Sequence, residues 1–135
     1  MDTHVFSIET GYRRGIADLT ADVARFVAGR GDGLLNVFVP HATAGIAIIE
    51  TGAGSDIDLM NALDDMLPRD HSRYRHQHGS PGHGADHVMP GIVAPSVVVP
   101  VLDGRPSLGT WQSIVLVDPN EDNAVRQIRL SFIPG

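Results

Sequence analysis

Histidines are concentrated in one short part of the chain, together with arginines. Five of the seven histidines lie between residues 71 and 87, in the set His71, His76, His78, His83 and His87, with Arg69, Arg73 and Arg75 among them. Imidazoles bind divalent metals, and guanidinium groups bind phosphate. The pattern therefore indicates a metal or phosphate site. The alternative is a solvated, mobile histidine-rich loop, because the glycines and prolines between these residues disfavour regular structure.

Two other segments carry candidate site residues. His41 follows an apolar run and precedes small residues in Pro40-His41-Ala42-Thr43-Ala44-Gly45, where a ligand could approach the backbone closely. An ordinary turn histidine is the alternative. Trp111, the only tryptophan, opens a predicted strand and is more typical of a core residue than of ligand stacking. Gln112 would point to the opposite face, as a polar site residue or as sheet surface.

The composition excludes several classes of function. The chain of 135 residues has no cysteine, which removes disulfides, thiolate nucleophiles and cysteine-ligated metals. All ten basic residues are arginine, so lysine chemistry is absent, and a net charge of −6 argues against binding to nucleic acid. No apolar run approaches the length of a membrane span, and no secretory signal pattern opens the chain. We expect one domain over residues 1–135, located in the cytoplasm.

Hydrophobic periodicity predicts the elements that position these residues. Strands are expected at residues 5–9, 34–39, 44–50, 96–101, 108–117 and 127–132, with helices at 18–28 and 55–67. The runs at 34–39 and 44–50 suggest a paired unit with His41 at its turn, and Asp103-Gly104 predicts a hairpin turn. Short connections between strands favour an α+β domain of mostly antiparallel, sandwich-like sheets with two outer helices.

Taken together, the motifs resemble the YjbQ family, also called the secondary thiamine-phosphate synthase family. The resemblance runs from about residue 5 to 133, and its most specific element is Leu-Gly-Thr-Trp-Gln after the Asp103-Gly104 turn. The matching residues are His41-Ala42-Thr43-Ala44-Gly45 followed by Glu50, Tyr74-Arg75-His76, His87, Leu108-Gly109-Thr110-Trp111-Gln112, and Arg126.

The resemblance implies a sheet-rich α+β subunit assembled as a homotrimer. It also implies a site of three histidines, carried over to His41, His76 and His87, that holds a metal ion or an anion. Some members join a pyrimidine pyrophosphate to a thiazole phosphate and release pyrophosphate, as a secondary activity. The chain departs from the family near this site, with Ile49-Glu50-Thr51 in place of Asn-Glu-Asn, Asp86 in place of Ala, and Asp118 in place of Glu. These changes concern substrate and metal preference, not the fold.

Three neutral imidazoles suit a divalent transition metal, zinc above all, with one open coordination position, whereas Mg²⁺ would enter with a pyrophosphate substrate. We expect Glu50 and Asp86 to act as general bases or as carboxylates behind the ligands. The candidate substrate-binding residues are Arg73, Arg75, Thr43, Gln112 and Arg126.

A second ligand set, His78, His83 and His87, is conceivable because the last two have helical spacing. Pro81, Gly82 and Gly84 argue against a helix there, so His71, His78 and His83 are expected to be dispensable. Three functions fit these residues: an enzyme acting on a phosphorylated small molecule, such as a thiamine-phosphate synthase, a metal-dependent phosphoester hydrolase, or a non-catalytic trimeric protein that binds a metal or a phosphometabolite.

Overall fold

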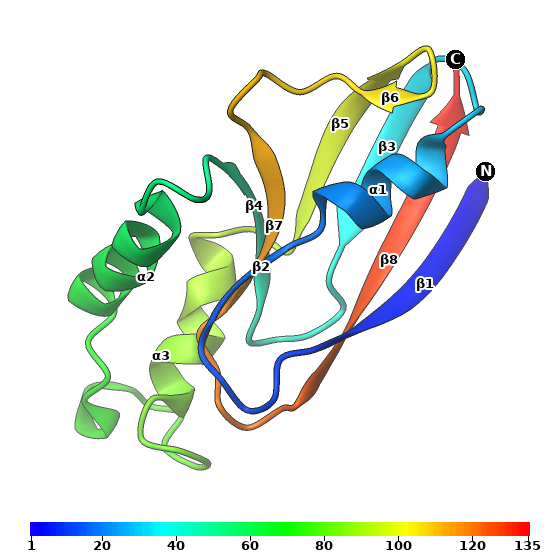
Figure 1. Ribbon diagram of the computed structural model, residues 1–135. Helices are drawn as coiled ribbons and strands as arrows, with labels where there is room; N and C mark the ends of the chain where they lie inside the picture. Colours follow the sequence, from blue (N-terminus) through cyan, green and yellow to red (C-terminus); the bar gives the residue numbers. More distant parts are fainter.

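The computed structural model describes residues 1–135 as two antiparallel sheets with helices on the outside (Figure 1). The five-stranded sheet has the order β1 (Asp2–Glu9), β8 (Val125–Pro134), β3 (Gly33–Phe38), β5 (Ser96–Leu102) and β6 (Arg105–Pro106). The three-stranded sheet has the order β2 (Gly15–Asp18), β7 (Ser113–Asp118) and β4 (Gly45–Ile49). All strand pairs are antiparallel, which confirms the α+β class.

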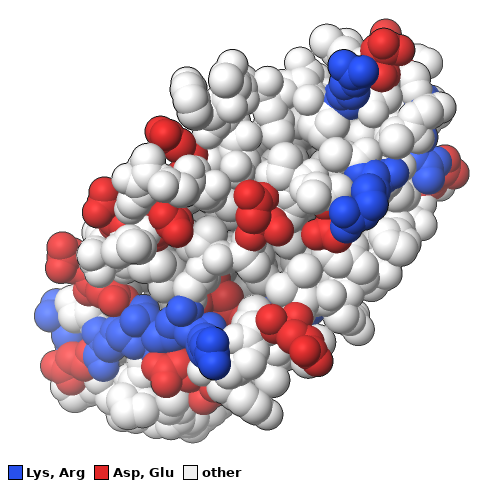
Figure 2. Space-filling view, in the orientation of Figure 1, with Lys and Arg blue, Asp and Glu red and all other residues white.

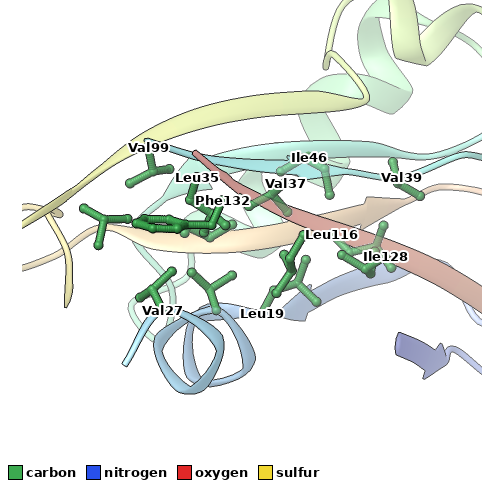
Figure 3. Packing of buried hydrophobic residues seen from close by; sticks show 14 of the residues in the cluster. Leu19, Val27, Leu35, Val37, Val39, Ile46, Val99, Leu116, Ile128 and Phe132 are labelled. Atoms are coloured by element: carbon green, nitrogen blue, oxygen red, sulfur yellow. The ribbon is translucent and has the colours of Figure 1, made fainter. Parts of the chain in front are cut away.

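The main core lies between the two sheets and helix α1 (Thr20–Val27) (Figure 3). Strand β8 shows why: Ile128, Leu130 and Phe132 alternate along one face and are buried, as the sequence predicted. Residues of α1, of both sheets and of the segments between them complete this cluster, including Leu19, Val23, Val27, Leu35, Val37, Val99, Ile46, Ile114 and Leu116.

A second apolar layer covers the other face of the three-stranded sheet. There α2 (Ser55–Met66) and the short 3₁₀ helix η2 (Met89–Gly91) contribute Leu63 and Met89, which pack with Val115 and Val117 of β7. Strand β7 is therefore buried on both faces, and this explains its unbroken apolar run from residue 114 to 117. None of the helices has the length and apolar character that crossing a bilayer would require.

The connections differ from the predicted hairpins in two places. The runs at 34–39 and 44–50 do not pair with each other, since β3 belongs to the five-stranded sheet and β4 to the three-stranded one. The turn that contains His41 carries the chain from one sheet to the other. The Asp103-Gly104 turn forms as expected, with φ of 50° and 68°, but its second strand is only Arg105–Pro106.

Residues 108–112 form a turn rather than the start of a strand, and this corrects the prediction for Trp111. The amide of Leu108 donates to the carbonyl of Pro106, and that of Gln112 donates to Gly109, so the chain bends before β7 begins at Ser113. The amide of Ser107 donates to the carbonyl of Pro100, but Pro100 has no amide hydrogen with which to return this bond. Trp111 is 74% exposed instead of buried in the core.

The histidine-rich segment contains a third helix, α3 (His83–Val88), which lies beside α2. The sequence predicted only two outer helices for the whole chain. The buried residues of α3 are Gly84, Ala85 and Asp86. A 3₁₀ helix, η1 (His71–Arg73), precedes it. The segment is thus folded against the rest of the protein and is not a free loop.

One buried ion pair ties the end of β7 to β8. Both nitrogens Nε and Nη2 of Arg126 donate to the carboxylate of Asp118, each at 2.8 Å, and Nη2 also donates to Oγ1 of Thr43 at 2.9 Å. Both members of the pair are about 1% exposed. Burial removes the hydration of both charges, so each ion depends on the other.

We expect Arg126→Met to lower the free energy of unfolding by about 3–5 kcal/mol, because it leaves the Asp118 carboxylate buried without a counterion. Urea denaturation measures this. The double variant Asp118→Leu/Arg126→Met, which removes both charges, is expected to be more stable than the single one. A single variant within about 1 kcal/mol of the parent protein would contradict the prediction.

Candidate functional site

Four imidazole rings gather where α3 meets the loop that precedes it. The ring centroid of His76 lies 4.0 Å from that of His78, 4.8 Å from His83 and 4.3 Å from His87. His83 and His87 are 4.5 Å apart, and His78 and His83 are 5.0 Å apart. We call these four residues the histidine cluster.

Helix α3 brings two members of the cluster onto one face. His83 and His87 are four residues apart, so their side chains are neighbours on a helix, and their Nε2 atoms approach to 2.9 Å. The helix forms despite Pro81 and Gly82 because both precede its first turn, where proline and glycine are tolerated. The amide of Asp86 donates to the carbonyl of Gly82 and begins the helical hydrogen bonding.

Glycine within α3 is explained by the loop that crosses the helix. A Cβ atom on Gly84 would lie 2.6 Å from Cβ of Tyr74 and 2.7 Å from the carbonyl oxygen of His76. A larger residue would therefore push the loop, and His76 with it, away from the helix. The glycine that argued for mobility in the sequence is the residue that lets His76 approach His83 and His87.

The cluster fits a metal ion in both geometry and donor chemistry. One ring nitrogen from each of His76, His83 and His87 lies within 4.8 Å of the other two. Tetrahedral zinc with Zn–N bonds of roughly 2.0–2.1 Å needs ligand nitrogens about 3.3 Å apart, so movements of about an ångström suffice. Nε2 of His76 is buried and has no hydrogen-bond partner. A buried nitrogen without a partner is costly unless something binds it.

The electrostatics favour the neutral form of two rings of the cluster, His76 and His87. Burial lowers the pKa of His76 below its ordinary value, and the charges of His78 and His83 lower it further. Burial also lowers the pKa of His87, with further contributions from His83, His76 and His78. Neutral imidazole is the form that coordinates metals, so these lowered pKa values are compatible with a metal site.

A buried polar network lies behind the cluster. The Asp86 carboxylate is 1% exposed and accepts hydrogen bonds from Nη1 and Nη2 of Arg69, at 2.6 and 3.2 Å, and from Nδ2 of Asn120 at 2.9 Å. Asp122 accepts a hydrogen bond from the ring of His83 at 2.9 Å, which lowers the pKa of that carboxyl group. Asp86, predicted as a general base, is thus occupied in holding α3 to its neighbours.

His41 lies outside the cluster, in contrast to the predicted ligand set of His41, His76 and His87. Its Nε2 accepts a hydrogen bond from the backbone amide of Gln127 at 3.0 Å. Burial lowers the pKa of His41, and the charge of Arg126 contributes in the same direction. The three histidines whose ring nitrogens lie close together are His76, His83 and His87, so His83 and not His41 is the third member.

The structure separates the other predicted site residues into buried and exposed ones. Arg126 and Thr43 are buried and contact each other and Asp118, so neither presents a free polar group to a substrate. Glu50 and Gln112 are exposed, and Oε1 of Gln112 accepts a hydrogen bond from the amide of Gly109. Neither of them belongs to the histidine cluster.

Arg73 and Arg75 remain as the candidates for binding an anion. Both are exposed, and neither forms an ion pair. Arg73 is the last residue of η1, and Arg75 lies in the loop that follows it, directly before His76. Figure 2 shows a band of arginine surface at the end of the molecule where α2 and α3 lie, with acidic groups on either side of it.

Sequence reasoning considered His83 but preferred His41, and it missed Asn120 and Asp122. The helical spacing of His83 and His87 was the available signal, and it was outweighed by the surrounding glycines and proline. Asn120 and Asp122 lie in the turn between β7 and β8, and nothing near them in the sequence indicates a contact with α3. His83, the residue that Asp122 contacts, is 39 residues away in the chain.

We expect the metal-free protein to lose thermal stability as the pH falls from 7.5 to 5.5. The folded-state pKa values of His76 and His87 lie below that of an unfolded histidine, so acid protonates the unfolded chain first and favours it. The stability is present above about pH 6.5 and is lost as the pH falls towards the folded-state pKa values. Thermal denaturation in the presence of a chelator measures this.

The double variant His76→Gln/His87→Gln is the control for the pH experiment. Its melting temperature should depend less on pH, with a residual slope from His41, whose pKa is also lowered. A melting temperature of the parent protein that stays constant or rises on acidification would show that the cluster is not held in its neutral form.

Comparison with protein families and solved structures agrees with this fold. A family model described as "UPF0047 protein YjbQ-like" matches residues 4–135. The chain is 64% identical to UPF0047 protein Rv2556c of Mycobacterium tuberculosis over the full length of both, and 36% identical to YugU of Bacillus subtilis over 79% of this chain and 81% of that one.

Solved structures extend the similarity to the fold. The protein APE1520 of Aeropyrum pernix superposes with a TM-score of 0.90 at 29% identity and covers 100% of both chains. A YbjQ-like protein of unknown function from Sulfolobus solfataricus, at 24% identity, has the same fold, with a TM-score of 0.90 and coverage of 99% of this chain and 97% of that one. The match to the family model over residues 4–135, together with these relatives, shows that the chain belongs to the UPF0047 family of YjbQ-like proteins.

Proposed function

We propose that the protein is a metal-dependent enzyme that acts on a phosphorylated small molecule in the cytoplasm. The observation that carries the proposal is the set of three imidazoles, His76, His83 and His87, with nitrogens in mutual reach and one buried nitrogen without a partner. Three nitrogen ligands with an open position are typical of catalytic zinc. Such a metal, when bound, supplies a Lewis acid for a phosphate oxygen.

The side chains near the cluster support a phosphorylated substrate. Arg73 and Arg75 are exposed, lack carboxylate partners and precede His76 by three residues and one residue. Guanidinium groups bind phosphate through paired hydrogen bonds and keep their charge at every physiological pH. In this proposal they hold the phosphate groups of the substrate beside the cluster.

Thiamine-phosphate synthesis is the specific reaction we propose. In it the thiazole nitrogen forms a bond to the methylene carbon of the pyrimidine, while the bond from that carbon to the pyrophosphate oxygen breaks. The leaving group departs with both electrons of the broken bond as pyrophosphate. Arg73 and Arg75 would stabilise the negative charge that develops on it. Mg²⁺ would enter with the pyrophosphate substrate, because it prefers oxygen ligands.

We expect untagged protein to hold about one zinc ion per chain, because three imidazoles form one site. Alanine at His76, His83 or His87 should each abolish binding, as measured by elemental analysis after dialysis. His4→Ala, in β1, is the matched control and should retain the metal. His41→Ala distinguishes the two ligand sets: it retains zinc if His83 is the third ligand and loses it if His41 is.

The reaction is tested with the metal-loaded protein. Incubation with the pyrimidine pyrophosphate and the thiazole phosphate should yield thiamine phosphate and pyrophosphate in equal amounts. Release of phosphate from either substrate alone would instead indicate a phosphoester hydrolase. Binding of both without turnover would indicate a non-catalytic protein that binds phosphometabolites, and a metal-free protein that binds no zinc would overturn the proposal.

We also propose that the protein is a homotrimer. The outer face of the five-stranded sheet exposes Leu34, Val98, Leu102 and Ile133, and strand register places Leu34 opposite Ile133 of β8. Next to Leu34 on β5 lies Pro100. Contiguous apolar side chains on a sheet face are typical of a surface that another chain covers. The family resemblance supplies the threefold symmetry.

Light scattering should therefore give three times the subunit mass of 14.4 kDa. Val98→Arg places a charge in the apolar face and is expected to dissociate the assembly. Ile57→Arg is the control, because Ile57 is similarly exposed (65%, against 57% for Val98) but lies on α2. A parent protein of one subunit mass at micromolar concentration would refute the trimer.

A further inference from the structure

We propose that Asp122 is a positioning residue that fixes the proton of His83 on Nδ1 and so directs the free lone pair of Nε2 into the histidine cluster. The inference builds on the proposed function, since its purpose is metal binding. It concerns a residue in the turn between β7 and β8, which follows Asp118 and precedes Val125.

The contacts of a single carboxylate oxygen carry the argument. Oδ2 of Asp122 lies 2.9 Å from Nδ1 of His83, 3.1 Å from Oγ of Ser80 and 3.2 Å from Nδ2 of Asn120. The hydroxyl and the amide both act as donors to this oxygen. A carboxylate has no proton to give, so the ring nitrogen of His83 must be the third donor.

The proton on Nδ1 determines the state of the other ring nitrogen. Neutral imidazole carries one proton, so Nε2 of His83 is left with a free lone pair. This Nε2 lies 2.9 Å from Nε2 of His87, a separation that requires a proton between the two atoms. Because His83 has none there, His87 donates in the metal-free protein, and a metal takes the place of that proton.

Asp122 is itself held in place from the core. Its backbone amide donates to Oδ1 of Asn120 at 2.9 Å. Asn120 is fully buried and also donates from Nδ2 to Asp86, which is paired with Arg69. The carboxylate therefore has a fixed position relative to α3. A carboxylate behind a ligating histidine fixes the tautomer and makes the ligand nitrogen more basic.

The first test measures the tautomer directly. In the metal-free protein at pH 8, the ¹⁵N shifts of the imidazole rings should show His83 protonated on Nδ1. Protonation of His83 on Nε2 would overturn the inference. This measurement needs neither a variant nor a bound metal, so it remains decisive even if the parent protein binds no zinc and the proposed function fails.

The second test measures zinc affinity by competition with a chromophoric chelator. Asp122→Asn retains an acceptor oxygen without the charge, and Asp122→Ala removes both, so affinity should fall by about 10–100-fold, more for alanine. Ser80→Ala should have a smaller effect, because His83 keeps its carboxylate. Asp65→Asn, which removes an exposed carboxylate on α2, is the matched control and should stay within twofold of the parent.

The variants also separate positioning from a merely structural role. Asp122→Asn should lose zinc affinity and shift the His83 tautomer while its metal-free melting temperature remains close to that of the parent. If the parent protein binds zinc and both Asp122 variants bind it with an affinity within twofold of the parent's, Asp122 does not position His83. A loss of affinity that follows only a loss of folding, with the tautomer unchanged, would likewise overturn the inference.

Discussion

The buried carboxylate of Asp86 is the constraint on which the candidate site depends. Helix α3 is six residues long and would not be stable by itself. It is fixed because Asp86, 1% exposed, accepts three hydrogen bonds, two from Arg69 before the histidine-rich loop and one from Asn120 after β7. A buried charge must have all its partners, so these three segments meet in one arrangement only. The position of the histidines follows from that arrangement.

The turn between β7 and β8 connects the two histidine regions of the molecule. At its ends Asp118 and Arg126 form the buried pair that contacts Thr43, close to His41. At its middle Asn120 and Asp122 contact α3. One turn therefore supports both the residues that the family resemblance placed in the site and those that the structure adds. The same turn therefore supports the site whether His41 or His83 is the third ligand.

The sequence predicted the parts of the fold that depend on local pattern. The alternation of Ile128, Leu130 and Phe132 and the turn at Asp103-Gly104 are examples, since each follows from neighbouring residues alone. It failed where a distant contact decides. Trp111 lies in a turn because the chain changes sheets after Pro106, and α3 contains Gly84 because Tyr74 and His76 pack too closely against it for a larger residue. Neither contact can be predicted from the spacing of residues along the chain.

The charge state of the cluster determines what it can bind. Four rings whose centroids lie within about 5 Å of at least one neighbour cannot all be protonated, because like charges at that distance repel strongly. Lowered pKa values at His76 and His87 agree with neutral rings. Neutral imidazoles coordinate cations and carry no charge that would hold a phosphate, so the charged groups available for a phosphate are arginines or a bound metal. In the proposed function the exposed Arg73, at the end of η1, and Arg75, just after it, bind the phosphate, and this division of roles would let a cation site and an anion site coexist in so short a segment.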